Sequence, residues 1–265
     1  MAKVIQIFNQ KGGAGKTTST IQIAAELSKN FGKRCLLFDF DPSCNLTNGL
    51  AHSENPEMYF SDIILEVYDE EIEEDIHLAI CKTEFEGIDL VPEARKNMKK
   101  TSKGLPRCDM YSPVGCLDPF IEQIYDEYDF IFFDCAAGGV EFNLMAMCAA
   151  EYLLIPTDDN PDGVDGASAT LTDMRQCKKL YNPKLDLIGV YLSNSFERRT
   201  FTKELKVVLG EQLKDKLIPI AIRNAAVAIK ARTLRIPLCY AFPNEPINQD
   251  YHKLAEYILE YTEGR

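Results

Sequence analysis

The chain has 265 residues, of which 46% are hydrophobic and 26% charged, with a formal net charge of −12. These values are typical of a globular protein with a sizeable core, and the overall acidity excludes a general coat of basic charge for nucleic acid. No apolar run reaches the roughly 18 residues of a membrane span, and the N-terminus lacks the pattern of a secretion signal. The nine Cys are scattered without a CxxC pair, so we expect reduced thiols in a cytoplasmic protein.

Short apolar runs bounded by turn residues predict seven strands along the chain. The runs are apolar on both faces, as buried strands of a parallel sheet are. The predicted strands cover residues 4–8, 35–38, 88–91, 130–133, 152–155, 187–192 and 217–220.

Helical patterns separate these strands. The first shows a face of small residues at helical spacing, made by Ile21, Ala24, Ala25 and Ser28. Strand–helix alternation over the whole chain predicts an α/β fold, a doubly wound and mostly parallel sheet flanked by helices, in a single domain of residues 1–265. We expect the less regular residues to lie outside the sheet core. Further helices are predicted over residues 116–127, 163–180, 199–213 and 247–262, and the less regular residues are 54–87 and 99–115.

A glycine-rich loop follows the first strand and precedes a helix. Residues 9–18 read Asn-Gln-Lys-Gly-Gly-Ala-Gly-Lys-Thr-Thr, and such a loop at a helix N-terminus binds phosphate through backbone N–H groups. We expect Lys16 to reach the β- and γ-phosphates of ATP and the Thr17 hydroxyl to ligate Mg²⁺. The strict GxxxxGK[ST] pattern fails, because Gln10 stands at its first glycine and a second lysine, Lys11, opens the loop.

Carboxylates stand at the ends of two predicted strands. Asp39 and Asp41 follow the second strand, and Asp134 ends the fourth. Ligands bind at the carboxyl ends of strands in such sheets, so these acids are candidates to position Mg²⁺ and an attacking water. The alternative for Asp39 and Asp41, a pair of turn or helix-capping aspartates, is less favoured beside a phosphate loop.

The loop sequence from Lys11 to Thr18 resembles the deviant Walker A sequence of the ParA/MinD family of P-loop ATPases, which have the SIMIBI-type fold. The stretch from Asp39 to Thr47 is similar to the family pattern DxDPQGNxT, with Ser43 and Cys44 in place of Gln-Gly. Residues 149–157 are similar to another family segment, whereas Ala136-Ala137 replaces the usual Pro-Pro after Asp134. The resemblance covers residues 3 to about 180 and is closest to ParA/Soj-type partition ATPases.

This resemblance implies roles for individual residues. It implies a dimer that sandwiches ATP, in which Lys11 reaches the partner's nucleotide and neutralises charge on the transferring phosphate. The implied catalytic residues are Lys11, Lys16 and Asp41, where Asp41 orients the water; the implied metal residues are Thr17, Asp39, Asp41 and Asp134. The implied nucleotide-binding residues are Lys11, Gly12, Gly13, Ala14, Gly15, Lys16, Thr17 and Thr18, with Asn194, Arg223 and Asn224 as candidates near the adenine.

Charge is unevenly distributed along the chain. Residues 54–89 hold thirteen acids and one Lys, whereas residues 193–236 hold ten Lys and Arg and four acids. Partition ATPases bind DNA without sequence preference through such C-terminal cations, and phosphate neutralisation makes this binding sensitive to salt. Solvated helix faces are the equally weighted alternative. The candidate DNA-binding residues are Arg198, Arg199, Lys203, Lys206, Arg223, Lys230, Arg232 and Arg235.

The function implied by the resemblance is that of a ParA-like partition ATPase. It would bind ATP and Mg²⁺, dimerise, bind nucleoid or plasmid DNA, and hydrolyse ATP slowly until a ParB-like adaptor stimulates it. Three alternatives stay open: an ATPase that positions a protein cargo on the nucleoid, an electron donor like the nitrogenase reductases, and a nucleotide-binding switch without DNA. We expect no membrane partner, because Glu256, Glu260 and Glu263 flank the apolar stripe of the last helix.

Overall fold

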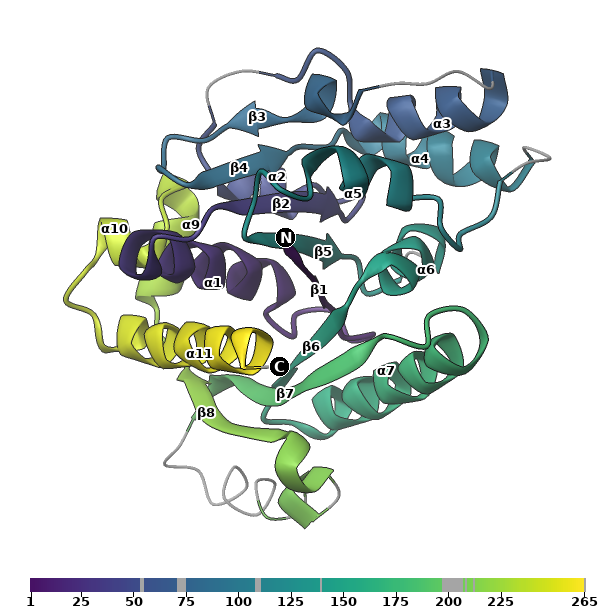
Figure 1. The fold of residues 1–265 in the computed structure, drawn as a ribbon. Coiled ribbons are helices and arrows are strands. Elements are labelled where there is room, and N and C mark those ends of the chain that lie inside the picture. Colours follow the sequence, from purple (N-terminus) through teal and green to yellow (C-terminus); the bar gives the residue numbers. More distant parts are fainter. Residues whose placement is uncertain are drawn as a thin grey trace.

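The computed structural model describes residues 1–52, 55–70, 75–107, 111–138, 140–196, 207, 209–211 and 213–264. An eight-stranded sheet with the order β3-β4-β2-β5-β1-β6-β7-β8 runs through the middle of the molecule (Figure 1). The strands are β1 (Lys3–Ile7), β2 (Cys35–Phe40), β3 (Cys81–Lys82), β4 (Ile88–Val91), β5 (Phe130–Cys135), β6 (Tyr152–Asp158), β7 (Asp186–Ser195) and β8 (Leu217–Arg223).

All strand pairs in this sheet are parallel except β3–β4, which is antiparallel. The seven predicted strands are therefore confirmed, and the short β3 covers one edge of the sheet. Parallel pairing places the carboxyl ends of the strands at one edge. Asp39 at the end of β2 stands beside Asp134 of β5, which in turn pairs with Ile7 of β1.

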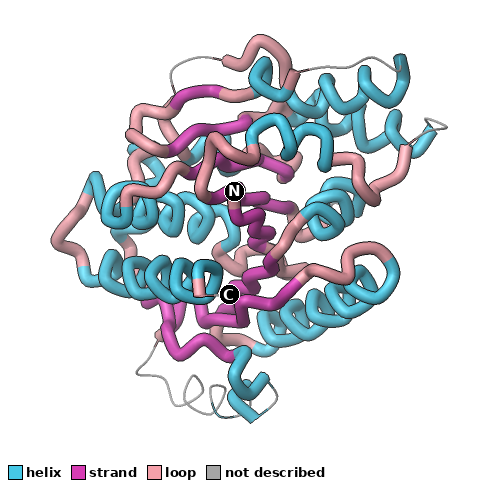
Figure 2. The backbone as a smooth tube through the Cα atoms, viewed as in Figure 1, coloured by secondary structure: helices cyan, strands magenta, loops and turns pink. Residues whose placement is uncertain are grey.

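Helices cover both faces of the sheet (Figure 2). The alternating side chains of β1 show the division: Ile5 and Ile7 pack in one core, and Val4 and Phe8 in the other. The larger helices are α1 (Lys16–Phe31), α3 (Phe60–Glu70), α4 (Arg95–Gly104), α5 (Asp118–Ile124), α6 (Val140–Ala149), α7 (Pro161–Leu180), α9 (Val227–Leu234) and α11 (Pro246–Glu263), and the short ones are α2 (Asn45–Gly49) and α10 (Leu238–Ala241).

The core on one side is formed by α1 and α11, which lie next to each other (Figure 1). Leu254 and Ile258 of α11 are fully buried there, so the apolar stripe of the last helix is packed against the protein. The other core contains residues of α3, α4, α5, α6 and α7. In the described part of the chain, no helix is both long enough and apolar enough to cross a membrane.

The sequence-based description of residues 54–87 and 99–115 as irregular is wrong in part. Helix α3 buries Ile63 and Ile64 in the core, α4 buries Thr101, and Leu105 directly after α4 is also part of the core. The two helices are joined by a hydrogen bond from Thr101 Oγ1 to the Ser61 carbonyl at 2.6 Å. Helices α6 and α9 were also not predicted, whereas the predicted helix over 199–213 lies mostly outside the described residues.

Candidate nucleotide-binding site

The loop between β1 and α1 has the geometry of an anion cradle. Gly13 and Gly15 adopt positive φ of 81° and 83°, which brings the chain tightly around into the N-terminus of α1. A Cβ on Gly15 would also lie 3.3 Å from Cβ of Ser193 in β7. Within the described chain, the backbone N–H groups of residues 12–16 donate no hydrogen bond of ordinary geometry to the protein. They are thus available to an anion at a helix N-terminus, where the dipole favours negative charge.

Residues outside the loop fix its position. The Asn9 side chain donates to the Pro156 carbonyl at 2.7 Å and accepts from the Lys11 N–H at 2.8 Å. The Ser193 hydroxyl donates to the Ala14 carbonyl at 2.7 Å. Helix α7 approaches from the other side, because a Cβ on Gly166 would lie 2.4 Å from Asn9 Oδ1. The cradle is therefore held by β6, β7 and α7 as well as by its own sequence.

Lys16 lies within this cradle with 8% of its surface exposed. Its Nζ donates to the carbonyls of Asn9 at 3.1 Å and Lys11 at 3.0 Å. Burial lowers the pKa of Lys16, while the nearby carboxylates of Asp134 and Asp41 oppose this shift. A cation in this position is well placed to neutralise phosphate charge next to the loop.

Asp134 is a fully buried carboxyl group whose two oxygens have no hydrogen-bond partner of ordinary geometry among the described residues. Burial raises its pKa well above the usual value, and the neighbouring Asp39 adds to this effect; the Thr17 hydroxyl and Lys16 oppose it. A buried acid without donors is unfavourable by itself. Water on a Mg²⁺ ion would supply both the donors and the positive charge, so Asp134 and Thr17 fit a magnesium site.

Asp39 has a different arrangement, because its oxygens are occupied by the following loop. Oδ2 accepts from the Thr47 N–H at 2.8 Å and its hydroxyl at 2.7 Å, and Oδ1 accepts from the Asp41 N–H at 3.2 Å. Burial raises the pKa of Asp39 to about 6, and these hydrogen bonds oppose the shift. Asp39 thus positions the loop that carries Asp41, and its role at a metal remains a prediction.

Asp41 is half-buried at the start of that loop. Its Oδ1 accepts from the Ser43 N–H at 2.8 Å and from the Ser43 hydroxyl. Ser43 is one of the two residues that depart from the family pattern, and here it orients the carboxylate. No residue in the described part of the chain donates to the second oxygen, which is therefore available to a water or an ion.

Lys11 points to its own chain in this structure. Its Nζ lies 2.8 Å from Asp158 Oδ2, 2.9 Å from Oδ1 and 2.7 Å from Asn160 Oδ1. Asn160 is also the N-cap of α7, whose Gly163 N–H it accepts at 2.9 Å. Neither Asp158 nor Asn160 was singled out from the sequence, since no local pattern there indicates a contact with a loop about 147 residues away.

The candidates for the adenine lie at the ends of β7 and β8. Ser195 and Arg223 are paired in the sheet, and the Asn224 N–H donates to the Ser195 carbonyl at 3.0 Å, so Asn194 and Asn224 are brought close together. Arg223 is bound to Asp250 of α11 by two side-chain hydrogen bonds of 2.6 and 2.7 Å. This ion pair reduces the charge that Arg223 can offer to DNA.

The remaining candidates for DNA binding divide into two groups. Lys230, Arg232 and Arg235 are exposed on α9 and at its end. Arg198, Arg199, Lys203 and Lys206 lie outside the described residues.

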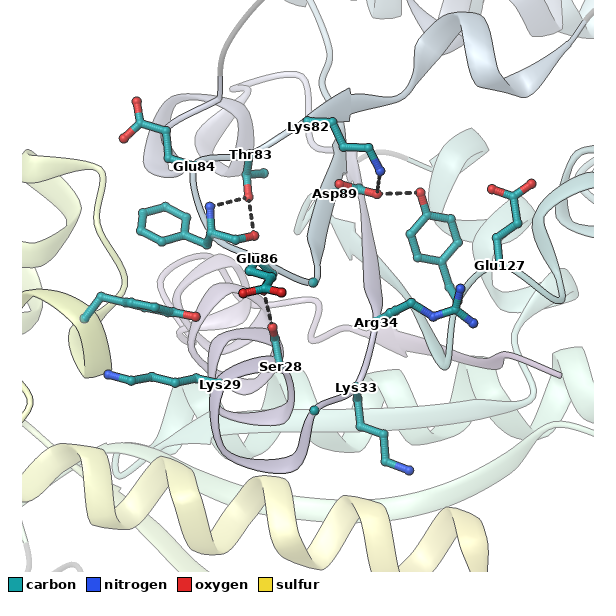
Figure 3. Close-up of a pocket in the computed structure, with 15 residues that line it drawn as sticks. Ser28, Lys29, Lys33, Arg34, Lys82, Thr83, Glu84, Glu86, Asp89 and Glu127 are labelled. Carbon is teal, nitrogen blue, oxygen red and sulfur yellow. Dashed lines mark hydrogen bonds and ion pairs between the residues drawn. The ribbon is translucent and has the colours of Figure 1, made fainter.

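A cavity of about 1060 Å³ lies away from this site, at the amino ends of β2, β4 and β5 (Figure 3). Its lining carries four cations, Lys29, Lys33, Arg34 and Lys82, and four acids, Glu84, Glu86, Asp89 and Glu127. Lys82 is paired with Asp89 at 2.6 Å and Lys33 with Glu263 at 2.5 Å. Because its charges are balanced, this cavity does not compete with the loop as a phosphate site.

The parallel sheet, the loop and the carboxylates define a P-loop nucleotide-binding protein. A family model described as an AAA domain matches residues 2–187. An uncharacterized protein of Pseudomonas putida is 32% identical over 85% of this chain and 84% of its own length. The sporulation initiation inhibitor protein Soj of Bacillus subtilis is 28% identical over 84% and 86%, respectively. A virulence plasmid ParA family protein of Chlamydia psittaci is 24% identical over 97% and 94%. The chain belongs to the ParA/MinD family of P-loop ATPases.

Solved structures agree on the fold. The septum site-determining protein MinD of Pyrococcus horikoshii, complexed with Mg-ADP, has a TM-score of 0.75 and 24% identity, over 97% of this chain and 96% of its own. Cobyrinic acid a,c-diamide synthase of Mycobacterium smegmatis, with a bound ATP analogue and magnesium, has a TM-score of 0.79 and 21% identity, over 100% and 97%. At these identities the likeness concerns the fold alone.

Proposed function

We propose that this chain is a ParA-like ATPase whose 265 residues act as one domain. It binds ATP with Mg²⁺, closes into a dimer around the nucleotide, binds DNA without sequence preference and hydrolyses ATP slowly. The observation that carries the proposal is the cradle at residues 12–16 with Lys16 inside it. Beside it lies Asp134, whose oxygens have no hydrogen-bond partner of ordinary geometry among the described residues. The proposed partner is a ParB-like adaptor, which stimulates hydrolysis. The proposed location is the cytoplasm, where the dimer binds nucleoid or plasmid DNA.

Each residue at the cradle has a defined task in this proposal. The backbone N–H groups of residues 12–16 and Lys16 bind the phosphates, and Thr17 and Asp134 hold the hydrated Mg²⁺. The metal ion, when bound, neutralises charge that develops on the phosphate oxygens. Asp41 orients the attacking water through its free oxygen. Hydrolysis of this kind depends on positioning and charge neutralisation, so slow turnover by an isolated subunit is expected.

Lys11 must leave Asp158 and Asn160 in order to reach the nucleotide of a partner subunit. The ion pair is partly buried, with 19% and 17% of the two side chains exposed. In our proposal this contact is the resting state of Lys11, and dimer closure replaces Asp158 by phosphate as its partner. Phosphate carries more negative charge than one carboxylate, which favours the exchange.

The proposed DNA contact is tested with a random-sequence duplex in the presence of ATP, ADP or no nucleotide, at low and moderate salt. We expect binding with ATP only, a steep loss as salt is raised, and weaker binding by Lys11→Ala and by charge reversal of Arg232 and Arg235. Lys82→Ala, which changes a cation far from the site, should bind as the wild type does.

A nucleotide switch that acts on a protein is the second candidate. Helix α9 exposes 72% of Ile229 and its end exposes 54% of Leu234. Large apolar side chains suit a protein partner better than a phosphate backbone. Absence of duplex binding in every nucleotide state, together with ATP-dependent dimerisation, would favour this candidate over DNA binding.

A further inference from the structure

Two arginines at the end of α9 hold the short helix α2, which follows the loop of Asp41. Arg235 Nη2 donates to the carbonyls of Thr47 and Leu50, each at 3.2 Å. Arg232 Nη2 donates to Asn45 Oδ1 at 2.6 Å, at the other end of α2. The last carbonyls of a helix lack partners within it, so a guanidinium group at this end satisfies them and complements the helix dipole.

The backbone of Arg235 also joins the two segments. Its carbonyl accepts from the Ala51 N–H at 3.0 Å. Arg235 has a φ of 59°, a left-handed conformation that glycine adopts far more easily. An arginine therefore occupies a position where the backbone favours glycine, and its side chain makes contacts that glycine could not make.

Hydrogen bonds continue from α2 to the water-orienting carboxylate. Thr47, whose carbonyl Arg235 binds, donates through its N–H and its hydroxyl to Asp39 Oδ2 at 2.8 and 2.7 Å. The other oxygen of Asp39 accepts from the Asp41 N–H at 3.2 Å. A continuous path of hydrogen bonds thus runs from the exposed end of α9 to the backbone of Asp41.

We propose that Arg235 is a positioning residue for ATP hydrolysis, which holds Asp41 in place through α2, Thr47 and Asp39. This inference rests on the proposed function for the reaction itself, while the structural link stands independently of it. Because Arg235 is exposed on the surface proposed for DNA, a phosphate group that binds this guanidinium competes with the carbonyls of α2. The end of α9 is thereby connected with the catalytic loop.

The test compares Arg235→Gly, Arg235→Lys and Lys253→Gln. Glycine suits the left-handed backbone, so Arg235→Gly removes the side chain without adding strain. Lysine restores a cation on a stem long enough to donate to the two carbonyls. Lys253 is an exposed cation of α11 and makes the same change of charge away from α2.

Amide hydrogen exchange of the nucleotide-free protein measures directly how much the Arg235 side chain stabilises Asp41 and Thr47. We expect the amides of Asp41 and Thr47 to exchange about tenfold faster in Arg235→Gly, the effect of about one lost hydrogen bond, and to be close to wild type in the other two variants. In ATP turnover we expect kcat to fall about tenfold in Arg235→Gly with little change in KM, and Arg235→Lys to regain most of it.

Wild-type exchange at Asp41 and Thr47 in Arg235→Gly overturns the proposal, as does a loss of kcat that lysine does not restore. If the amides exchange faster in Arg235→Gly but the wild type does not turn over ATP, the structural link between Arg235 and Asp41 is supported and the proposed function is contradicted.

Discussion

At the scale of single residues, the site is defined by side chains whose hydrogen bonding is incomplete or easily exchanged. Asp134 has two buried oxygens without an ordinary partner among the described residues, and Lys16 is bound only to neutral carbonyls of its own loop. Both groups gain stronger partners when phosphate and a hydrated cation arrive. This is the arrangement expected of a binding site that is preformed before its ligand binds.

Removal of the Lys16 ammonium group tests the cradle. We expect Lys16→Ala to weaken ATP binding by a factor of about 10 to 100, because a charge-assisted hydrogen bond contributes about 1.5–3 kcal/mol. Titration with a fluorescent ATP analogue in the presence of Mg²⁺ measures this. The matched change Lys82→Ala should leave the affinity unaltered, and an equal loss in both variants would remove Lys16 from the site.

Removal of the ion pair between Lys11 and Asp158 should make dimerisation easier. Asp158→Asn removes the charge that holds Lys11 in its own subunit, so we expect the dimer to form at several-fold lower ATP or protein concentration, corresponding to about 1 kcal/mol for a partly exposed pair. Light scattering of the ATP-bound protein reports the change. The control is Asp173→Asn, which removes the charge of another α7 carboxylate, one that accepts a hydrogen bond from the Gln10 side chain. Weaker dimerisation of Asp158→Asn would mean that Asp158 supports the closed state instead.

At the scale of the elements, helix α7 and strands β4 and β7 hold the catalytic loops. The side-chain contacts of these elements link residues that lie far apart in the sequence, such as Ser193 with Ala14 and Thr47 with the Glu93 N–H at 3.0 Å. Gly166 allows α7 to lie directly against Asn9 and Lys11, and Gly163 allows its first turn to lie against Asp158. Local changes in these elements are therefore expected to alter nucleotide binding.

Gly166 provides a measure of how closely α7 packs on the phosphate loop. A Cβ there would lie 2.4 Å from Asn9 Oδ1 and 2.8 Å from Lys11 Cβ, so Gly166→Ala must shift the loop. We expect a loss of about 1–3 kcal/mol in the free energy of unfolding, as for other overpacked sites, and weaker ATP binding. Urea unfolding and ATP titration are compared with Gly138→Ala, where a Cβ meets nothing within 4 Å. Unchanged ATP affinity in Gly166→Ala would show that the loop adapts.

We expect Glu93, two residues after β4, to make the stability of the protein depend on pH. It accepts the N–H groups of Ser61 and Ala94, both at 2.9 Å, and burial raises its pKa from the ordinary 4.5 to about 8. Between these two values the folded protein binds a proton that the unfolded chain has lost. The free energy of unfolding therefore falls as pH rises through this window, by at most about 1.4 kcal/mol per pH unit for one group.

Glu93→Gln cannot titrate, so its free energy of unfolding relative to the wild type should increase between pH 5 and pH 8. Urea unfolding at both values measures the difference, with the exposed Glu122→Gln as the control. A difference between Glu93→Gln and the wild type that is the same at both values would contradict the raised pKa.

At the scale of the whole molecule, the fold could be predicted because its signals are local, and most residues of the candidate site were proposed from signals that are equally local. Strands buried on both faces are continuous apolar runs, and the acids at their ends meet at one edge of any parallel sheet. Helix α4 escaped prediction because half of its ten residues are charged and only Met98 and Thr101 are buried. Helix α3 lies in the most acidic part of the chain, which hid its apolar face.

The contacts that complete the site had no local signal. Asp158 and Asn160 have the sequence of an ordinary strand end and helix cap, and only the structure brings them to Lys11. In the same way, the charge run of residues 193–236 did not indicate that Arg223 is bound by Asp250 or that Arg235 holds α2. Pairing over long separations is set by the topology of the sheet, which the linear pattern does not specify.

The central claim, that ATP closes two copies of this chain into a dimer through Lys11 and Lys16, is tested most directly by the mass in solution. Light scattering of the purified protein is measured with ATP and Mg²⁺, with ADP and Mg²⁺, and without nucleotide. We expect a doubled mass with ATP alone, a monomer in the other two conditions, and a monomer throughout for Lys16→Ala and Lys11→Ala. A mass that is the same in all three conditions, or a dimer that ignores both lysines, would contradict the account.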